Sequence, residues 1–125
     1  MSKTISLGDL QLAIMHELWR RGEATVTEVH KALSERDLAH TTIATMLTKL
    51  EQRGVVTHRN EGRKYVYSPC VSQGEVRRSM VSELKDRLFG GNTTALVSHL
   101  IDEHEVDEQE LKRLRMLLSD REEEQ

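Results

Sequence analysis

The residues most suited to binding chemistry lie in one stretch, AHTTIATMLTKLEQRG, at residues 39–54. Advancing about 100° per residue along this stretch predicts a helix with one apolar stripe. The stripe comprises Ile43, Met46, Leu47 and Leu50. The opposite face carries the hydroxyl and amide side chains of Thr41, Thr45, Thr48 and Gln52. Thr42 and Lys49 lie on one flank of that face. Because threonine is a mediocre helix former, a face of threonines indicates a contact surface rather than a face selected for helix stability.

A compact face of hydroxyl and methyl groups fits the floor of a DNA major groove. Threonine hydrogen-bonds to base edges, and its methyl group contacts the methyl group of thymine. We therefore predict that the base-contacting residues are Thr41, Thr42 and Thr45. Longer basic side chains beside them can reach phosphates, which fix register without reading sequence. The alternative is that the hydroxyls bond back to the carbonyl four residues earlier in the helix.

A β-hairpin is predicted directly after this helix. The runs VVTHR and KYVYS are rich in β-branched and aromatic residues, and the segment NEGR between them contains turn formers. Basic side chains cluster at the predicted tip, which suits a wing lying on a phosphate backbone; a solvated turn is the alternative. Together with the helix, the hairpin gives the predicted phosphate-contacting set: His40, Thr48, Lys49, Arg53, Arg59, Arg63 and Lys64.

The elements that must position these residues come earlier in the chain. Residues 6–9 have the form of a capping box opening a helix that ends before Gly22, and Thr25 with Glu28 opens a second helix. Three helices followed by a hairpin is the element order of a winged helix-turn-helix. Residues 1–70 are therefore predicted to form a winged-helix DNA-binding domain.

The remaining residues, 71–125, are predicted to form three helices with caps at Ser72, Asn92 and Asp107. Each helix carries one apolar stripe, and roughly 55 residues are too few to close a robust core alone. We predict that the stripes form a homodimer about a two-fold axis; the alternative is packing within a monomer. The predicted dimerisation residues are Val76, Met80, Leu84, Leu88, Leu96, Leu100, Leu111, Leu114 and Leu118. The predicted fold class is mainly α with a small β-hairpin: a winged helix-turn-helix domain followed by a three-helix dimerisation region.

The composition sets limits on location and partners. The 125 residues carry a net charge of −3, but residues 38–69 hold five Lys and Arg against two Asp and Glu. A locally basic stretch in an acidic chain indicates a surface for a polyanion. The single cysteine, Cys70, cannot form an internal disulfide, which favours a reducing compartment. No uncharged apolar run approaches the ~18 residues of a membrane helix, so we expect a cytoplasmic protein without membrane insertion.

Other chemistry has less support in the sequence. A tail segment gathers five metal-ligating side chains: His99, Asp102, Glu103, His104 and Glu105. They fit a zinc-type effector site between subunits, although a solvated surface is the commoner explanation of such a run. No nucleophile with a base, glycine-rich phosphate loop or paired-carboxylate site is recognisable. We expect no enzymatic activity, no metal and no cofactor.

Several fragments together resemble the penicillinase-repressor family of bacterial transcriptional regulators, the BlaI/MecI/CopY type. They are LGDLQLAIMHELW, ATVTEVHKAL, AHTTIATMLTKLEQRGVV and GRKYVYSP. The segment GGNTTALVSHLIDEHEVDEQELKRLRMLL resembles the family's C-terminal dimerisation region. The resemblance implies a homodimer with winged-helix heads on a palindromic operator. It matches Thr42 and Thr45 to recognition-helix threonines near bases, whereas Thr41 and Ala44 stand at positions that are often basic.

Family members that serve antibiotic-resistance operons lose activity when a membrane sensor-protease triggers cleavage of an Asn-Phe bond in the tail. The matching place here reads Ser98-His99-Leu100, so the resemblance implies a sensor-protease system as a partner without that cleavage site. Copper-responsive members use C-terminal Cys-x-Cys motifs, which a chain with only Cys70 lacks.

The leading hypothesis is a homodimeric, sequence-specific DNA-binding repressor, with residues 39–53 in the major groove and the wing at 59–64 on the backbone. Two alternatives remain open. One is a winged-helix protein-interaction module, which would expose an apolar patch on its third helix. The other keeps DNA binding and adds a metal effector bound through His99 and His104.

Overall fold

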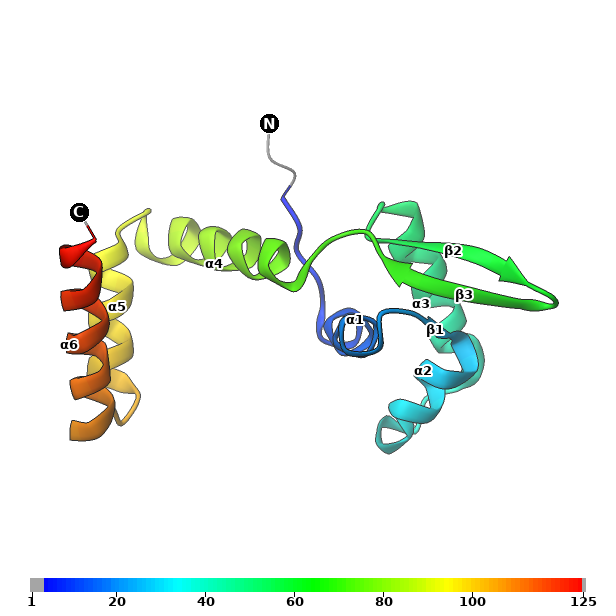
Figure 1. The fold of residues 1–125 in the computed structure, drawn as a ribbon, viewed down its shortest axis with the longest axis horizontal. Coiled ribbons are helices and arrows are strands. Elements are labelled where there is room, and N and C mark those ends of the chain that lie inside the picture. The colour runs from blue at the N-terminus through cyan, green and yellow to red at the C-terminus, as the bar shows by residue number, and fades with distance from the viewer. Residues whose placement is uncertain (1–3, 125) are drawn as a thin grey trace. The chain divides into compact units, whose positions relative to one another are not determined.

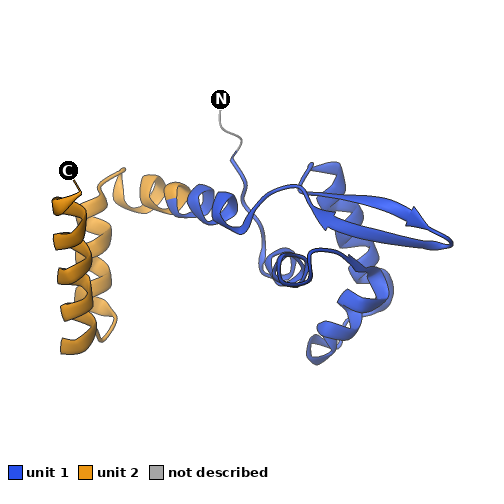
Figure 2. Cartoon of the chain, in the orientation of Figure 1, with its two compact units in different colours: residues 1–81 blue, residues 82–125 orange. Residues whose placement is uncertain are grey.

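The computed structural model describes residues 4–124, which fall into two compact units. The N-terminal unit ends at residue 81, and the C-terminal unit begins at residue 82 (Figure 2). One helix, α4 (Gln73–Phe89), contributes residues to both units. The sequence predicted two domains that divide after residue 70. Whether the chain folds as two independent domains with that boundary stays a prediction.

The N-terminal unit has the element order of a winged helix-turn-helix (Figure 1). Its helices before α4 are α1 (Asp9–Arg21), α2 (Val26–Ala32) and α3 (His40–Gln52), with a 3-10 turn at Ser34–Arg36. Its strands are β1 (Ala24–Thr25), β2 (Val56–Glu61) and β3 (Lys64–Pro69). The predicted fold class, mainly α with a small β-hairpin, is confirmed.

The sheet is antiparallel, with strand order β1-β3-β2. The hairpin of β2 and β3 places His58 opposite Tyr67, and Gly62 at φ 63° forms part of its turn. On the other side of β3, Ala24 lies opposite Tyr67. The sequence did not predict β1, because two residues are too few to show the alternation typical of a strand. This short strand joins the wing to the start of α2.

The core of the N-terminal unit takes one apolar stripe from each helix. In α3, Ile43, Leu47 and Leu50 are fully buried, as their helical spacing predicted. The other core residues come from α1, α2, the sheet, α4 and the segments that flank these elements: Leu7, Ile14, Met15, Leu18, Ala24, Val29, Leu33, Val55, Val56, Tyr67 and Val76. With its inner face fixed in this way, α3 presents its opposite face outward.

The start of α1 differs from the prediction. The expected capping box at residues 6–9 is wrong: α1 begins at Asp9 with Gly8 as its N-cap, and the Gly8 N–H donates to Gln11 Oε1 over 3.0 Å. The preceding segment is tied down elsewhere, since the Ile5 N–H donates to Ser79 Oγ and the Leu7 side chain is buried. Tertiary packing of Leu7 therefore overrides the local capping signal.

The C-terminal unit contains the end of α4, then α5 (Thr93–Glu103) and α6 (Glu108–Glu123). Its predicted caps are confirmed, because Asn92 Oδ1 accepts from the Ala95 N–H and Asp107 Oδ1 from the Glu110 N–H. None of residues 82–124 is buried. The helices of this unit thus form without enclosing a core of their own.

Candidate nucleic-acid interface

Helix α3 exposes its threonine face. Thr41, Thr42 and Thr45 are all exposed, on the side of the helix away from the buried stripe. The N-cap residue Ala39 has no side-chain cap, and the first turn of α3 carries no acidic residue. The positive end of the helix dipole is therefore not neutralised by its own first turn, which favours an anion nearby.

The other predicted phosphate-contacting residues at α3 differ in whether their side chains already form hydrogen bonds or ion pairs within the chain. Lys49 is exposed, and among the described residues it has no ion-pair partner. The Thr48 hydroxyl donates to the Ala44 carbonyl over 3.0 Å, the back-bonding considered as the alternative for this face. Arg53 Nη2 donates to the Ser6 carbonyl over 2.8 Å, which ties the segment before α1 to the end of α3. Lys49 is thus the long basic side chain on α3 that is most available to a phosphate.

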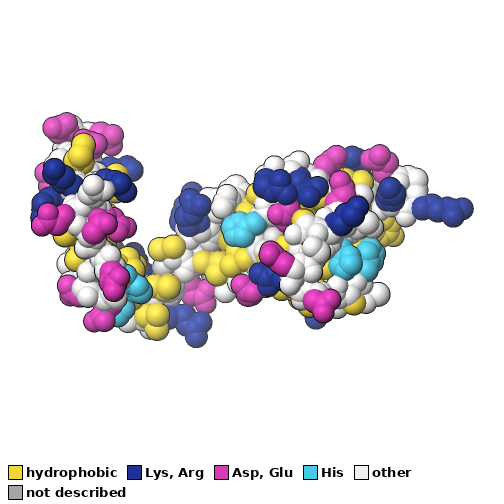
Figure 3. Space-filling model, turned by 90° about the horizontal axis from the view of Figure 1, so that it is seen from below, with side chains coloured by type: hydrophobic (Ala, Val, Ile, Leu, Met, Phe, Trp, Pro, Cys, Tyr) yellow, Lys and Arg dark blue, Asp and Glu magenta, His cyan; other side chains and the backbone are white. Residues whose placement is uncertain are grey.

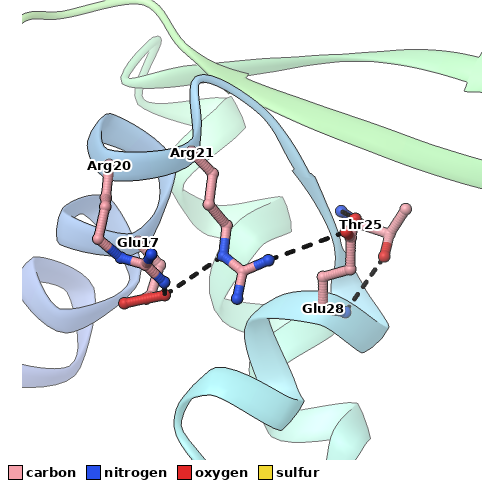
Figure 4. Close-up of polar contacts among 5 residues, drawn as sticks. All are labelled: Glu17, Arg20, Arg21, Thr25 and Glu28. Carbon is pink, nitrogen blue, oxygen red and sulfur yellow. Dashed lines mark hydrogen bonds and ion pairs between the residues drawn. The ribbon is translucent and has the colours of Figure 1, made fainter.

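The turn from α1 into α2 is held by a small polar network (Figure 4). The Thr25 N–H donates to Glu28 Oε1 and the Glu28 N–H to Thr25 Oγ1, the reciprocal capping box that the sequence predicted. Arg21 lies between Glu17 and Glu28, and Arg20 donates to Glu17 over 2.6 Å. The Arg20 hydrogen bond lowers the pKa of Glu17, and hydrogen bonds from Thr25 lower that of Glu28. The network fixes the first turn of α2 relative to α1.

His40 lies where α2 and α3 meet. Thr27 Oγ1 is 3.3 Å from His40 Nε2, and the His30 ring packs edge-on against the His40 ring at 5.5 Å between centroids. His30 Nε2 donates to the Leu38 carbonyl over 2.7 Å, which holds the loop before α3. His40 is exposed and oriented by these neighbours at the first position of α3.

The wing carries basic residues of two kinds. Arg59 pairs with Glu23 at 2.8 Å and also with Glu61, and hydrogen bonds to these carboxylates raise its pKa. Arg63 and Lys64 are exposed, and no ion pair is found for either within residues 4–124. Figure 3 shows Lys and Arg side chains at the free end of the β2–β3 hairpin. Arg63 and Lys64 are therefore the wing cations that remain available to an anion.

A cleft of about 370 Å³ separates the wing from the helix-turn-helix. It is lined by hydroxyl, basic and aromatic side chains with one apolar residue: Thr25, Val26, Thr27, His40, Arg63, Lys64 and Tyr65. None of these lining residues is acidic. We refer to it below as the wing cleft. It brings together three of the predicted phosphate-contacting residues from different parts of the sequence.

One contact between α3 and the wing was not anticipated. His58 Nδ1 lies 2.6 Å from Glu51 Oε1, and the His58 ring stacks on Tyr65 with 4.3 Å between centroids. The alternation along the two strands could have suggested that His58, Tyr65 and Tyr67 share a face of the hairpin. The pairing with Glu51 depends on where the hairpin lies against α3, which no local pattern gives.

The predicted dimerisation residues divide between the units. Val76 is buried in the core of the N-terminal unit, and Met80 packs against that core. In the C-terminal unit, Leu96, Leu111 and Leu114 are half-buried. The others are exposed: Leu84, Leu88, Leu100 and Leu118. The apolar stripe of α4 therefore serves its own unit at one end and remains uncovered at the other.

Other candidate sites gain no support in the described part of the chain. No group of three or more His, Cys, Asp or Glu side chains among residues 4–124 could hold a metal ion; the His99 and His104 rings pack edge-on at 5.9 Å. Cys70 is exposed. No helix within this range has the length and hydropathy needed to cross a membrane.

Comparison with known proteins identifies relatives along nearly the whole chain. The family model described as Penicillinase repressor matches residues 7–120. Transcriptional regulator BlaI of Mycobacterium tuberculosis is 37% identical over 116 residues, covering 90% of this chain and 84% of that protein. The Penicillinase repressor of Bacillus licheniformis is 26% identical over 121 residues, covering 96% of this chain and 94% of that protein.

A solved structure supports the same relationship. The solution structure of Bacillus licheniformis BlaI, in its monomeric form in complex with the blaP half-operator, matches with a TM-score of 0.51 and 33% identity. The match covers 60% of this chain and 93% of that chain. These relatives are transcriptional repressors and not enzymes. The chain belongs to the penicillinase repressor family.

Proposed function

We propose that this protein is a transcriptional repressor that binds a palindromic DNA operator as a homodimer. Helix α3 enters the major groove, with Thr41, Thr42 and Thr45 toward the bases. The wing lies along the phosphate backbone through Arg63 and Lys64. Repression follows because the bound dimer occupies DNA that transcription requires.

The observation that carries this proposal is the exposed threonine face of α3 together with two wing cations that form no ion pair within residues 4–124. A short polar face lets a helix backbone approach base edges, and free cations nearby supply the electrostatic part of affinity. A protein-interaction module would expose large apolar side chains on α3. Among residues 4–124, the exposed large hydrophobic side chains lie outside α3.

Family membership supports an operator built of two half-sites as the DNA that this chain binds. The related BlaI was solved in complex with a half-operator, which implies a full operator of two half-sites. Helix-turn-helix dimers bind half-sites about one helical turn apart, or a multiple of it, because operator symmetry mirrors protein symmetry. We infer that the present chain binds an inverted repeat in the same manner.

The C-terminal unit supports the homodimer. Leu88 is 71% exposed and Leu118 is 65% exposed, in a unit that buries none of its described residues. Helical stripes of this kind gain stability when they pack against a second copy across a two-fold axis. A membrane sensor-protease, the partner implied for ending repression, would act on a bond other than Asn-Phe, because α5 reads Ser98-His99-Leu100 at the matching place.

The test begins with the DNA itself. The full chain selects duplexes from a random-sequence pool, and the enriched duplex is then titrated by fluorescence anisotropy at several salt concentrations. We expect an inverted repeat to be enriched and affinity to fall steeply with salt. Enrichment of no sequence, or binding without salt dependence, would overturn the proposal.

Two substitutions distinguish a residue that contacts bases from a residue that contacts phosphates. Thr45→Ala should weaken binding of the selected duplex by about 1–3 kcal/mol while leaving binding of a scrambled duplex unchanged. Arg63→Ala should weaken binding of both duplexes and reduce the salt slope by about one. The matched controls are Thr94→Ala in α5 and Arg113→Ala in α6, both exposed helical residues of the C-terminal unit. Neither control should change affinity.

The dimer is tested by sedimentation. The full chain should sediment as a dimer, and a chain ending at Val81 should be a monomer. Leu88→Asp and Leu118→Asp should shift the full chain toward monomer, because burying an aspartate at an apolar interface is unfavourable. A truncated chain that remains dimeric would refute the assignment of the C-terminal unit.

A further inference from the structure

We propose that Tyr65 is a further DNA-contacting residue, whose phenol hydroxyl donates to the sugar–phosphate backbone, and that Glu51 and His58 hold its ring in the required position. This inference rests on the proposed function, because it names a further contact of the same surface. It arises from a cleft and an aromatic stack that the sequence did not reveal.

The surroundings of Tyr65 suit an anionic ligand. Tyr65 lines the wing cleft together with His40, Arg63 and Lys64, and no acidic side chain lines the same space. Tyr65 is 51% exposed, so it is accessible to a ligand in the cleft. A hydroxyl donor among basic groups is what a phosphate oxygen requires, since hydrogen bonds to charged acceptors are the stronger ones.

The core does not need the Tyr65 ring. Tyr65 and Tyr67 lie on the same face of β3, two residues apart, yet Tyr67 is only 4% exposed and belongs to the hydrophobic core. Tyr65 is outside that core. An aromatic side chain that is half exposed beside a basic cleft is better explained by binding than by packing.

The ring is nevertheless held in place. The His58 ring lies against it nearly in parallel, with 4.3 Å between centroids and 21° between planes. His58 is in turn fixed by Glu51, whose two carboxylate oxygens lie 2.6 and 2.9 Å from Nδ1. Glu51 belongs to the last turns of α3. A chain of contacts thus runs from the proposed recognition helix, through β2, to the cleft side of the wing.

This chain of contacts has a functional consequence. When α3 is seated in the major groove, the position of Glu51 determines where His58 and therefore Tyr65 lie. The groove contact and the wing contact are then made in one fixed geometry instead of independently. Pre-organising a contact group in this way removes part of the ordering cost of binding.

The first experiment removes the hydroxyl and keeps the ring. Tyr65→Phe in the full chain should weaken binding of the selected duplex by about tenfold, because a hydrogen bond to a charged acceptor is lost. The salt slope should stay unchanged, since an uncharged donor releases no counterion. Tyr67→Phe is the matched control, with the same chemical change on the same strand, and should leave affinity unchanged. Equal affinity of Tyr65→Phe and the unaltered chain would overturn the proposal.

The second experiment tests His58 as a positioning residue. His58→Ala should weaken binding about threefold to tenfold, in line with the loss of an aromatic pair. In the Tyr65→Phe background the same change should have no further effect, because there is no hydroxyl left to position. A merely structural role would lower affinity equally in both backgrounds, and that outcome would overturn the positioning role.

Loss of folding, failure of the proposed function and failure of the Tyr65 inference can be told apart. If circular dichroism shows that His58→Ala is unfolded, Glu51→Ala replaces it in the double-mutant cycle, because Glu51→Ala leaves the His58 and Tyr65 rings intact. If the unaltered chain selects no duplex, the proposed function fails and this inference fails with it. If the unaltered chain binds its duplex but Tyr65→Phe binds equally well, the inference alone fails.

Discussion

The two units of the chain are built from similar helices and differ in what those helices bury. In the N-terminal unit, α1, α2 and α3 each place at least one side chain in a shared core. In the C-terminal unit, none of residues 82–124 is buried, although the helices are capped as well as those of the first unit. Good capping and an apolar stripe are therefore sufficient to specify a helix but not a core.

Helix α4 shows the difference within one element. Val76 is 2% exposed and packs in the core of the N-terminal unit, whereas Leu88, on the same predicted stripe, is 71% exposed. The spacing of the stripe is continuous, so the sequence pattern alone treats both ends alike. What separates them is the presence of a surface to pack against. In our proposal, a second copy of the chain supplies that surface for Leu88.

The largest expected effect comes from truncating core residues. Leu47→Ala in α3 should lower the free energy of unfolding by about 2–5 kcal/mol, because it leaves a cavity in a fully packed core. Leu118→Ala in α6 removes the same atoms from a side chain that is 65% exposed. It should leave the stability of the N-terminal unit unchanged. Urea unfolding of both variants measures the difference. An equal decrease in the free energy of unfolding of the N-terminal unit in both variants would contradict the prediction.

A second prediction concerns where the N-terminal unit ends. A chain ending at Val81 keeps Val76 in the core, whereas a chain ending at Pro69 loses it together with Met80. The shorter chain should be less stable by at least about 1.5–3 kcal/mol, the contribution of one buried aliphatic side chain. Comparison of their urea midpoints measures the difference. Equal stability would support the domain boundary predicted at residue 70.

The local features of the N-terminal unit followed from the sequence. The stripe of α3, its exposed threonines, the hairpin and the capping box at Thr25 all depend on residues close together in the chain. Periodicity and capping are properties of such short segments, which is why they are predictable. The family resemblance was also recognised from contiguous fragments, and the match over residues 7–120 confirms it.

The features that could not be predicted from the sequence depend on contacts between residues that are far apart along the chain. Arg53, predicted as a phosphate contact, donates to the Ser6 carbonyl across the fold. Arg59, predicted as part of the wing surface, pairs with Glu23. The stack of His58 on Tyr65 requires a register between two strands and their placement against α3. None of these partners is fixed by spacing, so a basic residue could be recognised from the sequence without knowing which group it would contact.

A third prediction compares two helix caps. Thr25 caps α2 in the N-terminal unit and Asp107 caps α6 in the C-terminal unit, with the same side-chain acceptor geometry. Thr25→Ala should lower the free energy of unfolding of the N-terminal unit by about 0.5–2 kcal/mol. Asp107→Ala should leave that unit unchanged and weaken the dimer instead. Urea unfolding and sedimentation of both variants measure the two effects. The prediction is wrong if Asp107→Ala destabilises the N-terminal unit and Thr25→Ala weakens the dimer.

The smallest expected effect is pH-dependent and arises from Glu17. Its hydrogen bond from Arg20 lowers its pKa in the folded chain, so its contribution to stability is present above the pKa of an unfolded carboxyl, about 4.3. That contribution is lost as pH falls through the lowered pKa of the folded state. Glu17→Gln should therefore lower the free energy of unfolding by about 0.2–1 kcal/mol at pH 7, and the gap should narrow toward pH 3.5.

The matched variant is Glu83→Gln, which removes the ion pair with Arg87 in the C-terminal unit. Arg87 is 76% exposed and lies on the uncovered part of α4, so solvent screens the pair more strongly. Its loss should change the urea midpoint of the N-terminal unit at neither pH. If both variants gave the same pH-dependent gap, Glu17 would be acting through overall charge. A gap confined to Glu17→Gln would instead locate the effect in the network that joins α1 to α2.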